Sequence, residues 1–247
     1  LCDPTTYDLD CMKSDQTTAS DGLLDVLGGI QKEVIKVAGG DVPDARQDEY
    51  GDQGRQDILQ QFPLIEGHPK MELLNGILRK LLKLREKPSE IEYNIFVVRS
   101  ADVNAFTLGG EVYVTNALLE TAESLDELAC IIGHEIGHNE LGHIANQIKQ
   151  WEVTENLVGA EIASAIKMAT IGFNQQSEAE ADLYGIDLAL AAGYDACRGI
   201  DFWDRMQQRE GEVNELDNFF RSHPYSDRRA NCYRSHLSAL HRLTCEN

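Results

Sequence analysis

The sequence lacks three features that would each indicate a class of protein. None of its six cysteines forms a C-x-x-C pair, so a thiolate zinc site or a redox motif has no support. It has no run of 18 apolar residues, so no transmembrane segment is expected. Basic residues are few, because 22 Lys and Arg stand against 42 Asp and Glu, and a formal charge of -20 repels nucleic acid. The expectation is a soluble protein with an acidic surface.

The cysteines favour disulfides over metal binding. Cys2 and Cys11 are close enough in sequence for a local bridge, whereas Cys130 has the setting of a buried helix residue. Three more lie late in the chain: Cys197, Cys232 and Cys245. Disulfides would place the protein outside the cytosol, although unpaired buried thiols remain an alternative. A lipid anchor on Cys2 stays open only if the mature chain begins there rather than at Leu1.

Helical periodicity recurs in the first third of the chain. Apolar residues from Leu23 to Val37 predict an N-terminal helix that ends at Gly39-Gly40. The polar stretch after it is a linker or the start of a helix that runs through Leu59 to Phe62. A strongly amphipathic segment predicts another helix over Met71–Leu82. We therefore expect an N-terminal helical extension over residues 1–45 and one domain over residues 46–247.

A small sheet is predicted before the middle of the chain. Ile91, Tyr93, Ile95 and Val97 alternate as in a half-buried strand. A second strand, Glu111–Thr115, follows two glycines, and we expect the two strands to pair antiparallel. Residues after Asn116 read mainly as helix, including a buried one over Leu157–Phe173. The expected fold class is α+β and mainly helical, with a small antiparallel sheet ahead of the histidine helix.

The stretch H-E-I-G-H-N-E-L-G-H, residues 134–143, lies on a helix that begins at a capping box, Ser124 to Glu127. His134 and His138 are four residues apart, so they lie about 40° apart on the helix surface and can bind one ion. Glu135 projects from the flank of the same stripe, where a carboxylate could take a proton from water on the metal. The spacing indicates a metallohydrolase.

His143 is not expected to bind the same ion. It lies about 140° around the helix from His138, which places it out of reach while the helix continues. The glycines at 133, 137 and 142 indicate close approach of another element or a ligand, or they simply allow tight helix packing. A third metal ligand must therefore come from elsewhere in the chain.

The acidic segment S-E-A-E-A-D, residues 177–182, is the richest source of a third ligand. Glu178 and Asp182 share one face of a helix, whereas Glu180 points away from both. Glu178 could bind the metal while Asp182 orients a histidine. Compensation of the helix dipole also produces acidic residues at a helix start, and taken alone it is the stronger explanation.

Together these segments resemble one family. H-E-I-G-H at 134–138 followed by E-x-x-x-D at 178–182 is similar to the gluzincin metallopeptidases that include HtpX, BepA-like periplasmic proteases and the type I CAAX prenyl endopeptidase. N-A-F-T-L-G-G-E-V-Y-V-T, from Asn104, resembles the family's edge-strand segment, with Leu108 where Pro is commoner. S-H-P-Y-S-D-R-R, from Ser222, resembles its late H-P loop. The resemblance spans roughly residues 46–242.

The resemblance implies a zincin-like metallopeptidase domain of the soluble branch, in the bacterial periplasm. One Zn²⁺ per chain would be held by His134, His138 and Glu178, with Glu135 and Asp182 as catalytic residues. His223 would lie near the zinc, where it stabilises the tetrahedral intermediate or latches the open position. Partners would be unfolded or misassembled envelope polypeptides, with association to a membrane surface or envelope complex left open.

For substrate binding, we expect the strand Glu111–Thr115 to hold a peptide by β-augmentation. The predicted contacts are Asn104, Ala105, Val112, Tyr113 and Arg229. The alternative function is a zinc-bound, chaperone-like module that His223 keeps closed. A structural zinc site needs four protein ligands and no flanking carboxylate, so Glu135 favours an enzyme.

Overall fold

A computed structural model describes residues 7–12, 41–158, 172–209, 223 and 227–245. Its elements in chain order are η2 (Asp10–Met12), α2 (Asp44–Gln61), α3 (Met71–Leu82), β1 (Asn94–Val98), β2 (Ala105–Leu108), β3 (Glu111–Thr115), α4 (Asn116–Thr121), α5 (Leu125–Glu140), α6 (His143–Val158), α8 (Gln175–Ala191), α9 (Cys197–Gln208) and α11 (Asp227–His241). The predicted N-terminal helix and most of the predicted Leu157–Phe173 helix lie outside the described residues. The mainly helical α+β class is confirmed.

The sheet is mixed rather than antiparallel, and its strand order is β1-β3-β2. β3 pairs antiparallel with β2 but parallel with β1, so the predicted antiparallel pairing of the first strand with Glu111–Thr115 is wrong. The cause is β2, whose four residues are all buried and therefore show no alternation in the sequence. Gly109 and Gly110 adopt positive φ and form the tight turn between β2 and β3, so β3 returns beside β1 in the same direction.

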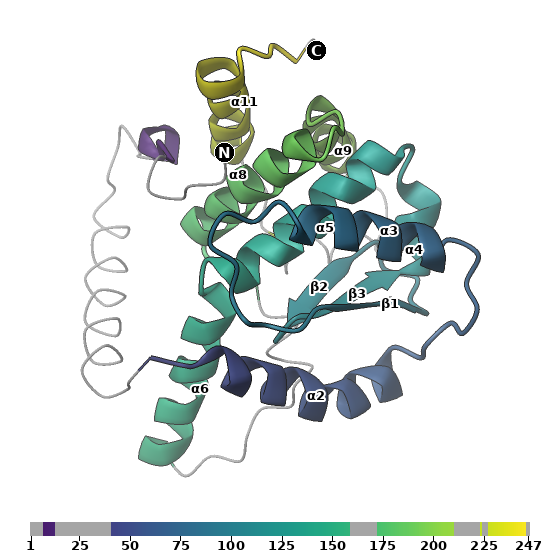
Figure 1. Cartoon of the computed structure of the whole chain (residues 1–247), viewed down its shortest axis with the longest axis vertical. Coiled ribbons are helices and arrows are strands. Elements are labelled where there is room, and N and C mark those ends of the chain that lie inside the picture. Colours follow the sequence, from purple (N-terminus) through teal and green to yellow (C-terminus); the bar gives the residue numbers. More distant parts are fainter. Residues whose placement is uncertain (1–6, 13–40, 159–171, 210–222, 224–226, 246–247) are drawn as a thin grey trace.

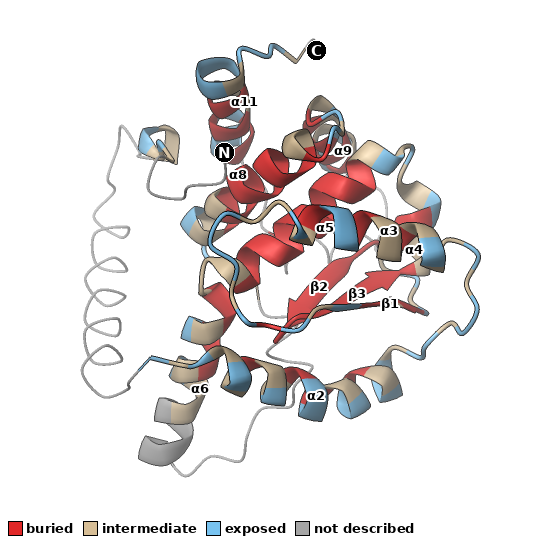
Figure 2. Ribbon diagram, viewed as in Figure 1, coloured by how far each residue is buried: buried red, intermediate tan, exposed pale blue. Residues whose placement is uncertain are grey.

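Helices cover both faces of the sheet (Figure 1). Successive strand residues point to opposite faces, so Val112 and Val114 join the larger core with α3 and α5, while Tyr113 joins a smaller core with Ile58 of α2. Because both faces are covered, all five residues of β3 are buried, as the red strands of Figure 2 show. The helix predicted over Met71–Leu82 is confirmed, and the polar stretch before Leu59 belongs to α2.

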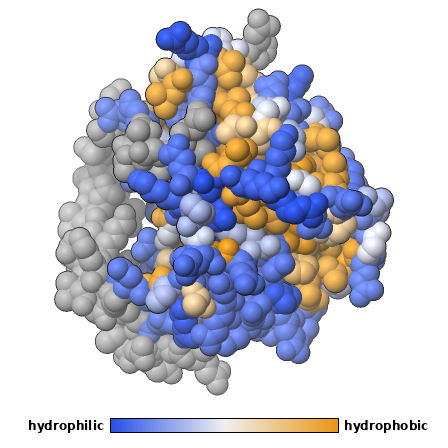
Figure 3. Space-filling model, in the orientation of Figure 1, coloured by the Kyte–Doolittle hydropathy of each residue, from blue (hydrophilic) through white to orange (hydrophobic). Residues whose placement is uncertain are grey.

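The surface fits the acidic composition. In Figure 3 the side chains at the foot of the view, over α2, are mostly hydrophilic. In the part of the chain that the structure describes, no helix is long and apolar enough to span a bilayer.

Two disulfides hold the C-terminal helix. Cys11 of η2 is bonded to Cys232 of α11, and Cys197 of α9 is bonded to Cys245. The predicted Cys2–Cys11 bridge is therefore wrong, because α11 brings a distant cysteine to η2. Cys130 is buried and free, and burial raises the pKa of its thiol to about 12, so it stays protonated and inert.

Helices α5 and α8 cross in close contact through glycine. A Cβ added to Gly185 would lie 2.6 Å from the backbone nitrogen of His134, and one added to Gly133 would lie 2.7 Å from the Gly185 carbonyl oxygen. Gly137 meets Ala181 in the same interface. The expectation that Gly133 and Gly137 mark close approach is confirmed. Gly142 differs, because its φ of +74° ends the helix region there.

We expect Gly185→Ala to lower the free energy of unfolding by ~1–3 kcal/mol, because the added methyl group meets backbone atoms that cannot move aside. Gly76→Ala on α3 is the matched control, since its Cβ meets nothing within 4 Å, and a better helix former there should stabilise by ~0.5–1 kcal/mol. Urea unfolding of both variants measures the difference. Equal stability of the two variants would show that the crossing tolerates a wider spacing.

Candidate metal centre

Helix α5 brings two imidazoles together in the interior. Its start is fixed by Ser124, whose Oγ accepts a hydrogen bond from the Glu127 amide, although the Glu127 carboxylate bonds the amide of Glu123 rather than that of Ser124. His134 and His138 then lie on one face with their Nε2 atoms 2.9 Å apart, and both side chains are buried. Two ring nitrogens that face each other in this way share a proton or a cation.

Helix α8 adds a carboxylate to the pair. Glu178 Oε2 lies 3.5 Å from His134 Nε2, and Glu178 Oε1 lies 3.4 Å from His138 Nε2. A tetrahedral zinc ion with ligands about 2.0–2.1 Å away has those ligands roughly 3.3–3.4 Å apart. Glu178 Oε1 is buried without a hydrogen-bond partner. The two carboxylate-to-imidazole distances, the donor types and this unsatisfied oxygen fit a zinc ion, so the cluster can hold the metal.

His134 is oriented by a buried ion pair. Its Nδ1 lies 2.9 Å from Asp182 Oδ1, so with the proton on Nδ1 it donates to Asp182 and leaves Nε2 for the metal. Arg229 donates to Asp182 from Nε and Nη2, at 2.8 and 2.9 Å, and its Nη1 lies 3.0 Å from Glu178 Oε2. One guanidinium thus holds both Glu178 and the carboxylate that orients His134.

His138 is oriented by a second chain of contacts. Helix α5 ends at Glu140 and α6 begins at His143, so the chain turns back at Gly142. His143 Nδ1 then lies 3.0 Å from His138 Nδ1, and His143 Nε2 lies 3.0 Å from Glu180 Oε2. His143 is outside the ligand cluster, as expected, but it contacts His138 because the helix does not continue. Glu180 points away from Glu178, and this places it against His143.

Glu135 and His223 complete the cavity beside the cluster. His223 Nε2 lies 3.6 Å from Glu135 Oε1, and its Nδ1 lies 3.3 Å from both His134 Nε2 and Glu178 Oε2. Glu135 is 2% exposed, and burial raises the pKa of its carboxyl. Burial acts in the same direction on Glu178, but Arg229 and His223 outweigh it and hold the pKa of Glu178 well below its usual value. The two carboxyl groups therefore have different proton affinities at one site.

The residues predicted to contact substrate are not all at this site. Val112 and Tyr113 lie in β3, which is hydrogen-bonded on both sides and cannot accept another strand, so β-augmentation at Glu111–Thr115 is wrong. Arg229 is 1% exposed beneath the ligands. Ala105 lies in β2, at the edge of the sheet, and its carbonyl lies 3.0 Å from His223 Nε2. Asn104 precedes Ala105 and bonds Thr115 through its backbone.

Two buried residues that the sequence analysis missed shape the site. Trp203 of α9 lies under the Arg229 guanidinium, 4.7 Å from ring centre to Cζ, and lines an apolar pocket beside His134 with Ile131 and Ile186. Asn139 accepts from the Gly110 amide and donates to Thr107 Oγ1, which ties the β2–β3 turn to α5. Asn139 could have been identified from the sequence because it directly follows His138. Nothing in the sequence around Trp203 indicated that Trp203 lies at the site.

Comparison with known proteins agrees with this geometry. Residues 70–236, more than half of the chain, match Peptidase family M48. Mitochondrial metalloendopeptidase OMA1 of Schizosaccharomyces pombe is 26% identical over 174 residues, covering 66% of this chain and 51% of the relative. Metalloprotease LoiP of Escherichia coli is 29% identical over 167 residues, covering 60% and 64%. Beta-barrel assembly-enhancing protease of the same species is 22% identical over 214 residues, covering 78% and 44%.

The chain spans 44–64% of the length of these curated relatives. Residues 70–236, which match the family, contain the histidine pair of α5 and the acidic segment of α8.

We expect His143→Ala to weaken zinc binding about 10- to 100-fold, because His138 loses the contact that fixes its ring and tautomer. Competition with a chromogenic chelator measures the affinity. His68→Ala is the control, since His68 lies on a different segment and its Nδ1 accepts from the Lys70 amide. Unchanged zinc affinity in His143→Ala would mean that the His138 ring is held by packing alone.

Proposed function

We propose that this chain, which belongs to peptidase family M48, is a zinc-dependent endopeptidase. Its metal ligands would be His134, His138 and Glu178, and Glu135 would be the proton acceptor. The observation that carries the proposal is the convergence of two imidazoles and one carboxylate beside a separate buried carboxylate. A structural site would not need Glu135.

In the proposed mechanism, zinc bound by His134, His138 and Glu178 supplies a Lewis acid that lowers the pKa of water and polarises a carbonyl. Glu135 accepts the proton of the attacking water and returns it to the departing amine, a task suited to a carboxyl whose pKa burial has raised. Asp182 and His143 contact the Nδ1 atoms of the two imidazoles and so orient both rings with Nε2 toward the metal position.

Substrate would bind at β2, whose outer edge is unpaired in the described sheet, and not at β3. An extended peptide that pairs with the outer edge of β2 would place its backbone near Ala105, whose carbonyl lies next to the cluster through His223. Backbone pairing gives little sequence preference, which suits unfolded polypeptides.

We further propose that the protein acts in the periplasm on misassembled envelope polypeptides. The two disulfides favour an oxidising compartment. One relative's name refers to assembly of β-barrels, which supports misassembled envelope polypeptides as the substrate class and the periplasm as the compartment.

A second candidate function rests on His223. Its Nδ1 lies with the three proposed ligands as a fourth donor, and its Nε2 bonds the edge carbonyl that substrate would approach. In this arrangement His223 latches the site, and the protein binds zinc and polypeptides with slow turnover.

Glu135→Gln should keep its zinc and lose casein cleavage by about 10²–10⁴-fold, because the amide cannot accept the proton of water. Metal analysis and a cleavage assay on the same samples separate the two effects. If neither wild type nor variant cleaves any unfolded substrate while both hold zinc, the endopeptidase proposal fails.

His223→Ala distinguishes a latch from a catalytic group. Opening a contact of about 0.5–1.5 kcal/mol should raise the cleavage rate roughly two- to tenfold, whereas loss of a group that stabilises the tetrahedral intermediate should lower it. Steady-state rates at equal zinc content decide between the two. An unchanged rate would remove His223 from both roles.

A further inference from the structure

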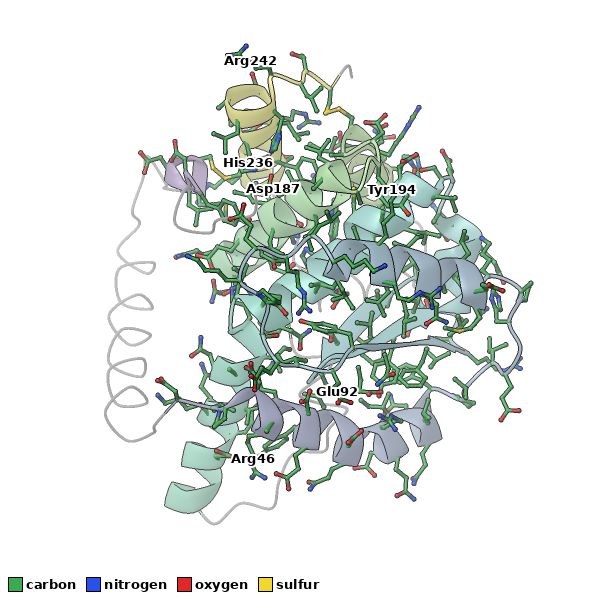
Figure 4. All side chains as sticks on the ribbon, in the orientation of Figure 1. Arg46, Glu92, Asp187, Tyr194, His236 and Arg242 are labelled. Atoms are coloured by element: carbon green, nitrogen blue, oxygen red, sulfur yellow. A yellow bond between two sulfur atoms is a disulfide. The ribbon has the colours of Figure 1, made fainter. Side chains whose placement is uncertain are left out.

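A second cluster of metal-binding side chains lies where α8 meets α11, away from the proposed catalytic site. Asp187 Oδ1 lies 2.8 Å from His236 Nε2 and 2.7 Å from His241 Nε2. Figure 4 shows Asp187 and His236 side by side between the two helices. Asp187 follows Glu178 by nine residues, so the two positions are roughly 13 Å apart along the helix. The cluster is therefore separate from the catalytic ligands.

The Asp187 carboxylate is buried with half of its bonding capacity unused. Its side chain is 1% exposed, and Oδ2 is buried without a hydrogen-bond partner. Among the described residues, its ionic partners are the two imidazoles, and neither an arginine nor a lysine reaches it. A buried carboxylate is normally compensated by a cation and by hydrogen bonds to both oxygens. A metal ion would supply the charge and a bond to a carboxylate oxygen.

We propose that Asp187, His236 and His241 bind a second divalent transition metal ion, of the zinc class. Two imidazole nitrogens and one carboxylate suit zinc and its neighbours, whereas calcium and magnesium require oxygen donors. One donor atom from each residue lies within 4.8 Å of the others, the same convergence that the catalytic cluster shows. His241 is 13% exposed, which leaves a path for the ion and for a water ligand.

The second ion would hold α11 against α8. Arg229, near the start of α11, bonds both Glu178 and Asp182. Cys232 lies between Arg229 and His236 on the same helix and is bonded to Cys11. An ion at Asp187 therefore fixes the helix that carries the guanidinium of the catalytic site. Tyr7 packs edge-on against the His236 ring and covers the cluster from the N-terminal side.

Metal stoichiometry tests the proposal without reference to catalysis. The protein is equilibrated with Zn²⁺ and freed of unbound metal by gel filtration. Inductively coupled plasma mass spectrometry should then find two zinc ions per chain. The variant His134→Ala/His138→Ala should keep one, and Asp187→Asn, which preserves shape, should also keep one. The proposal would be overturned if wild type carried only one ion and His134→Ala/His138→Ala carried none. It would also be overturned if Asp187→Asn still carried two ions.

Cobalt gives an independent readout if either variant fails to fold. Wild type loaded with one and then two equivalents of Co²⁺ should show visible absorption that grows through the second equivalent, because an ion held by two imidazoles and a carboxylate at low coordination number absorbs more strongly than hydrated Co²⁺. Absorption that saturates at one equivalent would overturn the proposal. The number of ions bound per chain does not depend on whether the protein cleaves peptides. The endopeptidase proposal and the second-metal proposal can therefore fail independently of each other.

Discussion

The contact between α5 and α8 is the constraint on which the site depends. Glycines at 133 and 185 let the two backbones approach within a distance that a single methyl group would prevent. At that separation the side chain of Glu178, from one helix, reaches the imidazoles of His134 and His138, from the other. A wider crossing would leave the three donors too far apart to share an ion.

Charge is the second constraint, because the crossing buries three carboxyl groups within a short span. Arg229 compensates Glu178 and Asp182 and keeps their pKa values low, while Glu135, without such a partner, has a raised pKa. Contact with the Arg229 guanidinium therefore suits Glu178 to bind a metal, whereas its absence suits Glu135 to accept a proton. The arrangement also explains why Arg229 is buried against Glu178 and Asp182.

Local spacing in the sequence predicted the parts of the site that lie on continuous helices. The four-residue intervals of His134 to His138 and of Glu178 to Asp182 are properties of one helix each, and both pairs share a face as expected. The contact of His143 with His138 was not predicted, since it depends on a turn at Gly142 that ends the helix early. The sheet order was missed because β2 is short, fully buried and without alternation. Pairing of Cys11 with Cys232 depends on tertiary packing, which neighbouring sequence does not specify.

The place of Arg229 in the chain has a consequence for biosynthesis. Synthesis proceeds from the N-terminus, so α5 and α8 leave the ribosome well before α11. Until α11 docks, Glu178 and Asp182 have no guanidinium to offset their burial, and the charged pocket is costly to close. The nascent chain thus reaches the finished arrangement of these side chains only after α11, its last described helix, has been made.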